Sequence, residues 1–378
     1  MTKLLVILIT VFFLSLIEGR PQHRKHTENT LELLHVIFRH GDRTPDKKVI
    51  YKNDPFINET YYPFGNGQLT NEGKRKEYGI GKALRKKYSH FLGDFTLDIV
   101  DSRCTDYNRT KMSLQLVLAS LFPPTGKHVW EKKLKWQPVP FNYWPVDEDH
   151  VLGDPHANCP RFQDSYLKYL NSSEGQKLYE NFTEIIKHLE LKTGQRLYSK
   201  SFAELYFTLT TESEYGLDIP EWSKAAYPFI KHLAILDYNT SSATDLQKRL
   251  STGFFIKKII DDSLAKSKGK GHEHTKIFLY SAHESNIAAV LRFLGIFYNH
   301  IPPYGSYITF EIHNVKGVRG IKVYYQDYSS EKPKKYKIPN CETFCTLERF
   351  ELLYKHLLPE SDQECFVATS EGRIVEEI

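Results

Sequence analysis

Short, nearly unbroken apolar runs recur along the chain, and they predict buried strands. Residues 33–38 form such a run and end abruptly at a basic segment. Residues 276–281 repeat the pattern far downstream, and residues 97–100 offer a shorter strand. Residues 307–313 and 321–326 flank a short segment that ends in a glycine, which predicts a β-hairpin.

Helical periodicity fills much of the remaining chain. Residues 70–92 predict an amphipathic helix, because Tyr78, Leu84, Tyr88 and Phe91 share one side and many Lys and Arg residues lie opposite. Further helices are predicted at residues 109–121, which Pro123 and Pro124 stop, and at 173–191 and 286–294.

The order of these elements predicts an α/β fold with an insertion. Strands separated by helices in the first and last thirds, with helices between them, favour one α/β domain that carries a helical insertion. We assign residues 30–135 and 248–365 to the α/β domain and residues 136–247 to the smaller helical domain. Two polar motifs follow strands at residues 39–45 and 281–284, where open α/β sheets bind ligands.

Composition and charge narrow the function classes. The chain has 378 residues, of which 40% are hydrophobic and 26% charged, as in ordinary globular proteins. Its net charge is +5, and its densest basic runs, 266–270 and 332–337, are interrupted by Gly, Ser or Pro. We therefore expect solvated loops and no nucleic-acid partner. The small net positive charge favours the attraction of small anionic substrates.

The N-terminus predicts secretion. Lys3 precedes an apolar or hydroxyl run over residues 4–17, which is too short to span a bilayer but typical of a signal peptide. We expect residues 1–19 to be the signal peptide, with cleavage near Gly19. No later segment is long and apolar enough for a membrane anchor, so the product should be extracellular.

In a secreted protein we expect the cysteines to form disulfides. The chain has five cysteines, so one of them must remain unpaired. Cys341 and Cys345 are close enough to close a small loop, while Cys159 and Cys365 could tie the middle of the chain to its end. Cys104 is then the expected free thiol.

Five sequons also suit a secreted protein. Asn108 adjoins Arg109, a candidate site residue where a glycan would obstruct access. We therefore expect glycans on the other four, which are Asn58, Asn171, Asn181 and Asn239.

The segment that follows residues 33–38 carries the strongest chemical signal. Arg39 and Arg43 flank His40, and arginine neutralises phosphate oxygens with a planar, permanently charged fork. Gly41 lets the backbone approach an anion closely. A neutral imidazole nitrogen can attack phosphorus in line and form a covalent intermediate. A mere surface loop explains poorly such a string at the end of a buried strand.

A second motif, Ser281-Ala282-His283-Glu284, follows the strand at residues 276–281. Here a histidine could donate a hydrogen bond to a phosphoryl oxygen. The adjacent carboxyl could protonate the leaving alcohol and then act as a base toward water. A His-Glu pair after a strand is more often structural, so this motif gains weight only from its pairing with the first.

Competing hydrolytic chemistries lack their motifs. A cysteine phosphatase needs five residues between Cys and Arg, and only four separate Cys104 from Arg109. A zinc hydrolase would need His where Ile287 stands. His272-Glu273-His274 could contact a metal but lies in a Lys/Gly-rich loop, and no Gly-x-Ser-x-Gly is present. We expect hydrolysis without a metal or cofactor.

Taken together, these motifs resemble the histidine acid phosphatase family, and within it the insect venom members. The resemblance covers roughly residues 35–365, and several independent motifs occur in the family's order. The matching segments are residues 39–45, 67–70, 108–113, 121–124, 158–162 and 281–284.

The resemblance implies a three-layer α/β sandwich with an inserted, mainly helical domain. It implies small phosphomonoester substrates and, by analogy, a possible homodimer. It also supports the bridges Cys159–Cys365 and Cys341–Cys345 and leaves Cys104 single. The implied roles are His40 as nucleophile, Glu284 as proton donor, and Arg39, Arg43, Arg109 and His283 as phosphate ligands.

One departure from the family pattern keeps an alternative open. The commonest pattern has Asp where this chain has Glu284, although the insect venom members also use Glu. A secreted binding or allergen-like protein could keep the fold with weak or no catalysis. Because the nucleophile and every phosphate ligand are present, we expect a secreted acid phosphatase that works through a phosphohistidine.

Overall fold

The computed structural model describes residues 30–270 and 273–366, so the expected signal peptide at residues 1–19 and His272 lie outside the described residues. Within the described part, one mixed sheet has the strand order β2-β3-β1-β4-β5-β6, and β7 pairs with β5. The strands are β1 (Leu31–Arg39), β2 (Val100–Cys104), β3 (Ile277–Ala282), β4 (Tyr307–Val315), β5 (Val318–Gln326), β6 (Lys334–Tyr336) and β7 (Cys345–Thr346).

Three parallel strands end together at one edge of this sheet. β3 lies between β1 and β2 and runs parallel to both, with Ser281 opposite Phe38 on one side and Cys104 on the other. β4 pairs antiparallel with β1 on its far side. The segments that follow β1, β2 and β3 therefore meet, and these segments include both polar motifs.

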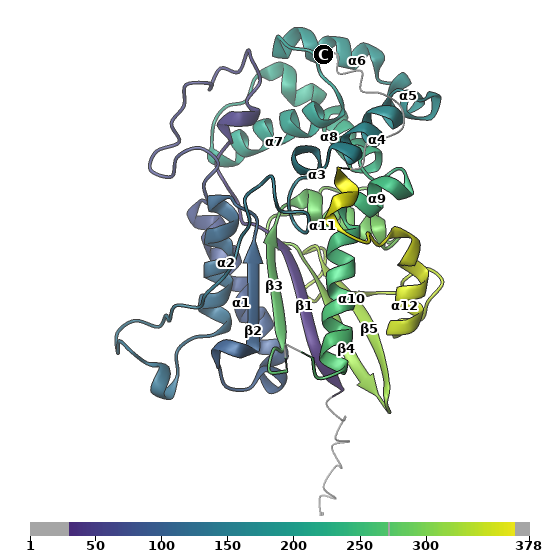
Figure 1. Cartoon of the computed structure of the whole chain (residues 1–378). Helices are drawn as coiled ribbons and strands as arrows, with labels where there is room; N and C mark the ends of the chain where they lie inside the picture. The colour runs from purple at the N-terminus through teal and green to yellow at the C-terminus, as the bar shows by residue number, and fades with distance from the viewer. Residues whose placement is uncertain (1–29, 271–272, 367–378) are drawn as a thin grey trace, which may run out of the picture.

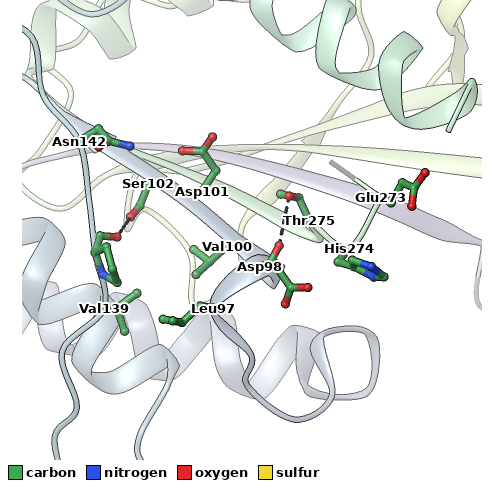
Figure 2. A pocket seen from close by; sticks show the side chains of 11 residues that line it. Leu97, Asp98, Val100, Asp101, Ser102, Val139, Asn142, Glu273, His274 and Thr275 are labelled. Carbon is green, nitrogen blue, oxygen red and sulfur yellow. Dashed lines mark hydrogen bonds between the residues drawn. The ribbon is translucent and has the colours of Figure 1, made fainter. Parts of the chain in front are cut away.

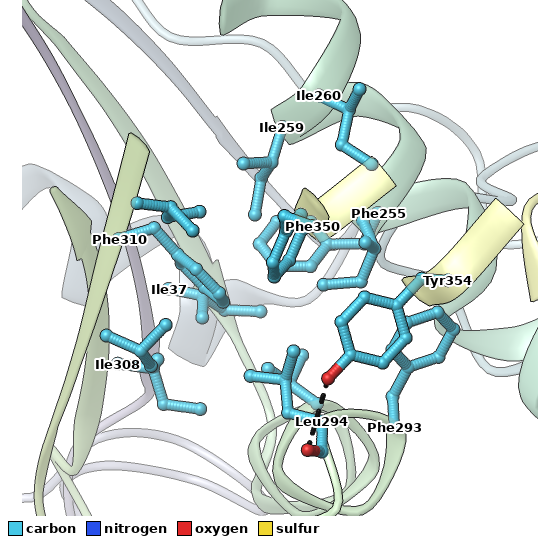
Figure 3. Close-up of a cluster of buried hydrophobic side chains, with 14 of the residues drawn as sticks. Ile37, Phe255, Ile259, Ile260, Phe293, Leu294, Ile308, Phe310, Phe350 and Tyr354 are labelled. Carbon is cyan, nitrogen blue, oxygen red and sulfur yellow. Dashed lines mark hydrogen bonds between the residues drawn. The ribbon is translucent and has the colours of Figure 1, made fainter. Parts of the chain in front are cut away.

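Alternate side chains of β1 face two separate cores, because successive strand residues point to opposite faces. Leu34, Val36 and Phe38 pack with α1 (Asn71–Leu92) and α2 (Asn108–Leu121). Leu33 and Ile37 pack on the other face, where Figure 3 shows Ile37 and Phe310 against side chains of α10, α11 and α12. Those three helices are Gly253–Ser267, Glu284–Phe293 and Leu347–Tyr354.

The sheet thus lies between two helical layers, with α1 and α2 on one side and α10 and α12 on the other (Figure 1). This arrangement confirms the predicted three-layer α/β fold. Mostly apolar runs, as in residues 33–38 of β1 and in β3, are typical of strands buried on both faces.

The remaining helices gather beyond the ends of β1, β2 and β3 (Figure 1). Within this group, α7 and α8 pack together around Leu205, Leu209, Ile230 and Leu233, which form a core separate from the two that flank the sheet. The group consists of α3 (Pro155–Asn158), α4 (Pro160–Leu170), α5 (Ser173–Glu180), α6 (Thr183–Thr193), α7 (Ser199–Tyr215), α8 (Glu221–Thr240) and α9 (Asp245–Ser251).

The predicted strand at residues 97–100 is wrong. A 3-10 turn occupies Leu97–Ile99, and β2 begins at Val100. The apolar pattern does not predict β2, because its central residues are polar yet buried. The Ser102 hydroxyl donates to the carbonyl of Pro140, and Arg103 forms an ion pair with Asp149 at 2.7 Å. Polar groups can be buried when they are hydrogen-bonded, and an apolar pattern does not reveal them.

The single helix predicted over residues 173–191 is also wrong. The chain forms α5 and α6 instead, with Asn181 and Phe182 between them. At this break the Thr183 hydroxyl donates to the carbonyl of Glu180 at 2.9 Å, a local bond that competes with helical hydrogen bonding.

The predicted hairpin is confirmed as β4 and β5. Lys316 and Gly317 connect the two strands, with φ of 53° and 84°. Positive φ at both turn residues matches the twist of the flanking strands, and glycine adopts it without strain.

Two disulfides are present within the described residues. Cys159, at the start of α4, is bonded to Cys365, and Cys341 is bonded to Cys345. Cys104 is a buried free thiol at the end of β2, and burial raises its pKa to about 12. Across residues 30–270 and 273–366, no helix has the length and apolar character needed to span a membrane.

Candidate active site

His40 is fixed at the end of β1 by main-chain bonds on both sides. Its N–H donates to the carbonyl of Ala282 at 3.0 Å, and its carbonyl accepts from the N–H of Gly305 at 3.3 Å. The residue is 1% exposed. The strand end and the segment before β4 thus set the imidazole's position before any ligand arrives.

Close packing against α1 requires a glycine at position 41. A Cβ there would lie 2.5 Å from the carbonyl oxygen of Gly73 in α1, closer than real Cβ contacts come. Its N–H donates to the Ser113 hydroxyl at 3.2 Å. The first turn of α1 therefore occupies the space that the absent side chain leaves.

The hydrogen bonding of His40 defines which ring nitrogen can react. Its Nδ1 lies 2.8 Å from the carbonyl oxygen of Gly41, and because a carbonyl only accepts, Nδ1 carries the proton. Nε2 then holds the lone pair. Burial lowers the pKa of His40 well below its usual value, and the nearby charges of Arg109, His283, Arg39 and Arg43 lower it further.

Arg39 is fixed by several contacts, but not all of its hydrogen-bond donors are used. Its Nη1 donates to the carbonyl of Pro302 at 2.6 Å, and its guanidinium stacks 3.8 Å from the centre of the Tyr304 ring. Its Nε lies 3.5 Å from a carboxylate oxygen of Glu284. Nη2 is buried with no hydrogen-bond partner among the described residues, so donors remain for an anion.

Arg43 and Arg109 come from different elements. Arg43 donates through Nη1 to the carbonyl of Thr44 at 2.9 Å. Arg109 lies in the first turn of α2, where its Nη1 is 3.1 Å from Asp46 and its guanidinium lies 4.5 Å from the centre of the Tyr107 ring. Such contacts pre-orient a guanidinium while leaving its other N–H groups to bind phosphate.

His283 and Glu284 begin α11. His283 is the N-cap, and its Nε2 lies 2.9 Å from the Thr105 hydroxyl. Its ring centre is 5.4 Å from that of His40. Burial lowers its pKa well below the usual value, as do Arg109, Arg43 and Arg39. Glu284 is the first residue of α11, and its side chain is 17% exposed.

A cleft of about 320 Å³ brings these residues together. It is lined by His40, Arg43, Arg109, His283 and Glu284, while Arg39 lies against Glu284. Helices α2 and α11 both begin at this cleft, and the N-terminus of a helix favours the binding of an anion. All six predicted site residues therefore meet around one cleft.

A second hollow, of about 380 Å³, lies at the opposite ends of β2 and β3 (Figure 2). Its carboxylates are those of Asp98, Asp101 and Glu273, and none of its lining residues in the described part of the chain is an Arg or Lys. This hollow is unsuited to a phosphate. Across the described ranges, no three or more His, Cys, Asp and Glu side chains are grouped to hold a metal ion.

The chain matches the histidine phosphatase superfamily (branch 2) over residues 30–332. It belongs to this superfamily. As a histidine phosphatase, it is 35% identical over 338 residues to the venom acid phosphatase Acph-1 of Apis mellifera, covering 88% of this chain and 87% of that protein. It is 32% identical to the prostatic acid phosphatase of Homo sapiens, covering 90% and 89%. The chain is accordingly a phosphatase that hydrolyses phosphate monoesters.

Solved structures support the fold of this histidine phosphatase. The phytase of Klebsiella sp ASR1 superposes with a TM-score of 0.63 at 15% identity, covering 90% of this chain and all of that one. The Hafnia alvei phytase in complex with tartrate gives 0.64 at 16% identity, covering 89% and 98%. At these identities the likeness concerns the fold alone.

Sequence reasoning missed several residues that shape the phosphatase site. Asp46 holds Arg109, Thr105 contacts His283, and Tyr304 stacks on Arg39. Thr105 directly follows β2, so a correctly placed strand would have predicted it. Asp46 and Tyr304 carry no such signal, because only the folded chain brings them to their partners.

Proposed function

We propose that this protein is a secreted acid phosphatase in which His40 Nε2 attacks phosphorus and forms a phosphohistidine. The observation that carries this proposal is the bond from His40 Nδ1–H to the carbonyl of Gly41, which leaves the Nε2 lone pair for attack in the cleft. Splitting the hydrolysis at a covalent intermediate replaces one difficult step by two easier ones.

In this proposal, four cationic or hydrogen-bonding groups hold the phosphate: Arg39, Arg43, Arg109 and His283. Three guanidinium groups neutralise the charge that spreads over the equatorial oxygens in the transition state. They also lower the pKa of His40. A nucleophile with a lowered pKa stays unprotonated in mildly acidic solution, where an ordinary histidine becomes charged.

Glu284 is the proposed proton donor. It begins α11 directly after His283, and it lies against Arg39 at the same cleft. As an acid it would protonate the leaving alkoxide oxygen. As a carboxylate it would then take a proton from the water that attacks the phosphohistidine, which restores His40 and releases phosphate.

Secretion is part of the same proposal. Two disulfides suit an oxidising compartment. Of the expected glycan sites, Asn58, Asn171 and Asn181 are exposed, whereas Asn239 is half-buried and accepts a hydrogen bond from Arg292. Glycosidase treatment of protein from culture medium should lower its mass, and finding the protein only inside producing cells would contradict this part.

We also propose that residues 136–247 form the insertion domain and shape the part of the cleft beyond the phosphate. Lys200, Glu204 and Phe207 of α7 line that part, together with Asp237 and Tyr238 of α8. The leaving alcohol would contact this surface.

The test is hydrolysis of nitrophenyl phosphate near pH 5 with a chelator present. We expect turnover by the wild type and none above background by His40→Ala. His90→Ala is the matched control, because His90 is exposed at the end of α1. Full activity of His40→Ala would refute the nucleophile, and an inactive but folded wild type would favour the binding-protein alternative.

A further inference from the structure

One face of α7 forms a wall of the catalytic cleft. Lys200, Ala203, Glu204 and Phe207 all line the cleft, and their spacing of three and four residues puts them on one side of the helix. Phe207 marks the phosphate end, because its ring centre lies 5.2 Å from the guanidinium carbon of Arg39. Glu204 lies about one helical turn from Phe207, on the order of 4.5 Å along the axis.

Glu204 differs from every other carboxylate of the cleft in having no partner among the described residues. Five of the others form ion pairs: Asp46 with Arg109, Asp106 with Lys111, Asp149 with Arg103, Asp154 with Lys200, and Glu284 with Arg39. The sixth, Asp237, accepts hydrogen bonds from Ser199 and Tyr166. A half-buried carboxylate without a partner is free to bind a group on a ligand.

The surroundings of Glu204 are negative on balance. Burial raises the pKa of Glu204. The positive charge of Lys200 lowers this pKa, whereas the negative charges of Asp237 and Asp154 raise it further. When all are ionised, three carboxylates face the one ammonium of Lys200. Three arginines lie at the phosphate end, so the cleft is positive near His40 and negative along this part of α7. Lys48 also lines the cleft, but it is exposed, and solvent screens its charge.

We propose that Glu204 determines substrate specificity and favours phosphomonoesters whose leaving alcohol carries a positive charge, such as amino-alcohol phosphates. This inference rests on the proposed function, because it requires the phosphate to lie beside His40. With the phosphate there, the alcohol extends along the wall that Phe207 and Glu204 form, and its cationic group lies near the unpaired carboxylate. A neutral alcohol would leave that carboxylate without a partner.

The test compares phosphocholine with 3,3-dimethylbutyl phosphate, in which carbon replaces the charged nitrogen at nearly equal shape. The readout is the ratio of the two kcat/KM values for each enzyme form. We expect the wild type to prefer phosphocholine and Glu204→Gln to lose about tenfold of that ratio, equivalent to about 1.4 kcal/mol. Glu221→Gln should keep the wild-type ratio, because Glu221 is 87% exposed at the start of α8.

The pH dependence gives a second readout that a merely structural role would not produce. Because burial raises the pKa of Glu204, its negative charge and the preference for phosphocholine should still be growing in the wild type as the pH rises above the usual range of a glutamate. In Glu204→Gln the ratio should change less with pH, because only the smaller contribution of Asp237, whose pKa burial also raises, then remains. Equal ratios in the wild type and Glu204→Gln, while nitrophenyl phosphate is hydrolysed through His40, would overturn only this inference. Loss of the His40 requirement would overturn the proposed function as well.

Discussion

Replacing Gly41 by alanine tests whether close backbone packing positions His40, the proposed nucleophile. The added Cβ would lie 2.5 Å from the Gly73 carbonyl oxygen and 2.8 Å from its carbonyl carbon, whereas ordinary contacts begin near 3.4 Å. The backbones would have to separate by 0.9 Å, the difference between 3.4 and 2.5 Å. Overpacking of this kind costs about 1–3 kcal/mol, and we expect the upper end because backbone atoms cannot rotate away.

Gly79 provides the matched control within α1. It is exposed, and a Cβ there would meet nothing within 4 Å. Replacing it by alanine should stabilise the helix by about 0.5–1 kcal/mol, since glycine weakens helix interiors. The two substitutions add the same methyl group but should move the free energy of unfolding in opposite directions, so the two variants should differ by about 3.5–4 kcal/mol.

The assay is urea unfolding followed by fluorescence, together with kcat on nitrophenyl phosphate under conditions where each variant is folded. We expect Gly41→Ala to be less stable and also slower, because the shift of the backbone displaces the imidazole of the adjacent His40. Gly79→Ala should keep the wild-type kcat. If Gly41→Ala were as stable as the wild type, α1 would not be packed against this segment as described, and the positional argument for His40 would be wrong.

Three further predictions concern the acid, the phosphate ligands and the pH dependence of stability. Glu284→Gln should depress turnover of alkyl phosphates by about 10²–10⁴-fold but spare nitrophenyl phosphate, whose leaving group needs little protonation; equal losses would refute the proton-donor role. Arg109→Ala should lower kcat/KM about 100-fold or more, given about 3 kcal/mol for a hydrogen bond to a charged group, whereas Arg75→Ala, at an exposed site, should not. Burial beside Asp54 raises the pKa of Glu212 to about 9, so folding loses stability as pH rises from the unfolded value toward that pKa. Glu212→Gln should therefore gain stability relative to the wild type between pH 5 and pH 8, and a parallel pH dependence of unfolding would contradict this.

The sequence predicts the framework of the fold where burial follows apolar character. The centre of β1 and nearly all of β3 are apolar, and α1 keeps a clear amphipathic pattern, so all three were predicted close to their observed bounds. β2 was misplaced, because buried Ser102 and Arg103 obtain their partners from segments about 40 residues away. No local pattern contains that information.

The two polar motifs that contain the proposed catalytic residues could be read from the sequence because each follows a predicted strand. The structure brings both motifs and Arg109 together at one edge, as expected from parallel strands. The partners that hold these groups could not be read in this way. Tyr304 lies more than 260 residues from Arg39 in the sequence. That Glu204 has no partner within residues 30–270 and 273–366 is likewise a property of the folded cleft alone.

The central claim is that phosphate passes through His40, and trapping the intermediate tests it most directly. The enzyme would be mixed with radiolabelled phosphomonoester and quenched in alkali, where phosphohistidine survives, and the labelled peptide would then be sequenced. We predict label on the peptide that contains His40, lost on brief acid treatment and absent from His40→Ala. Label on another residue, or turnover with no labelled enzyme at any time point, would contradict the account.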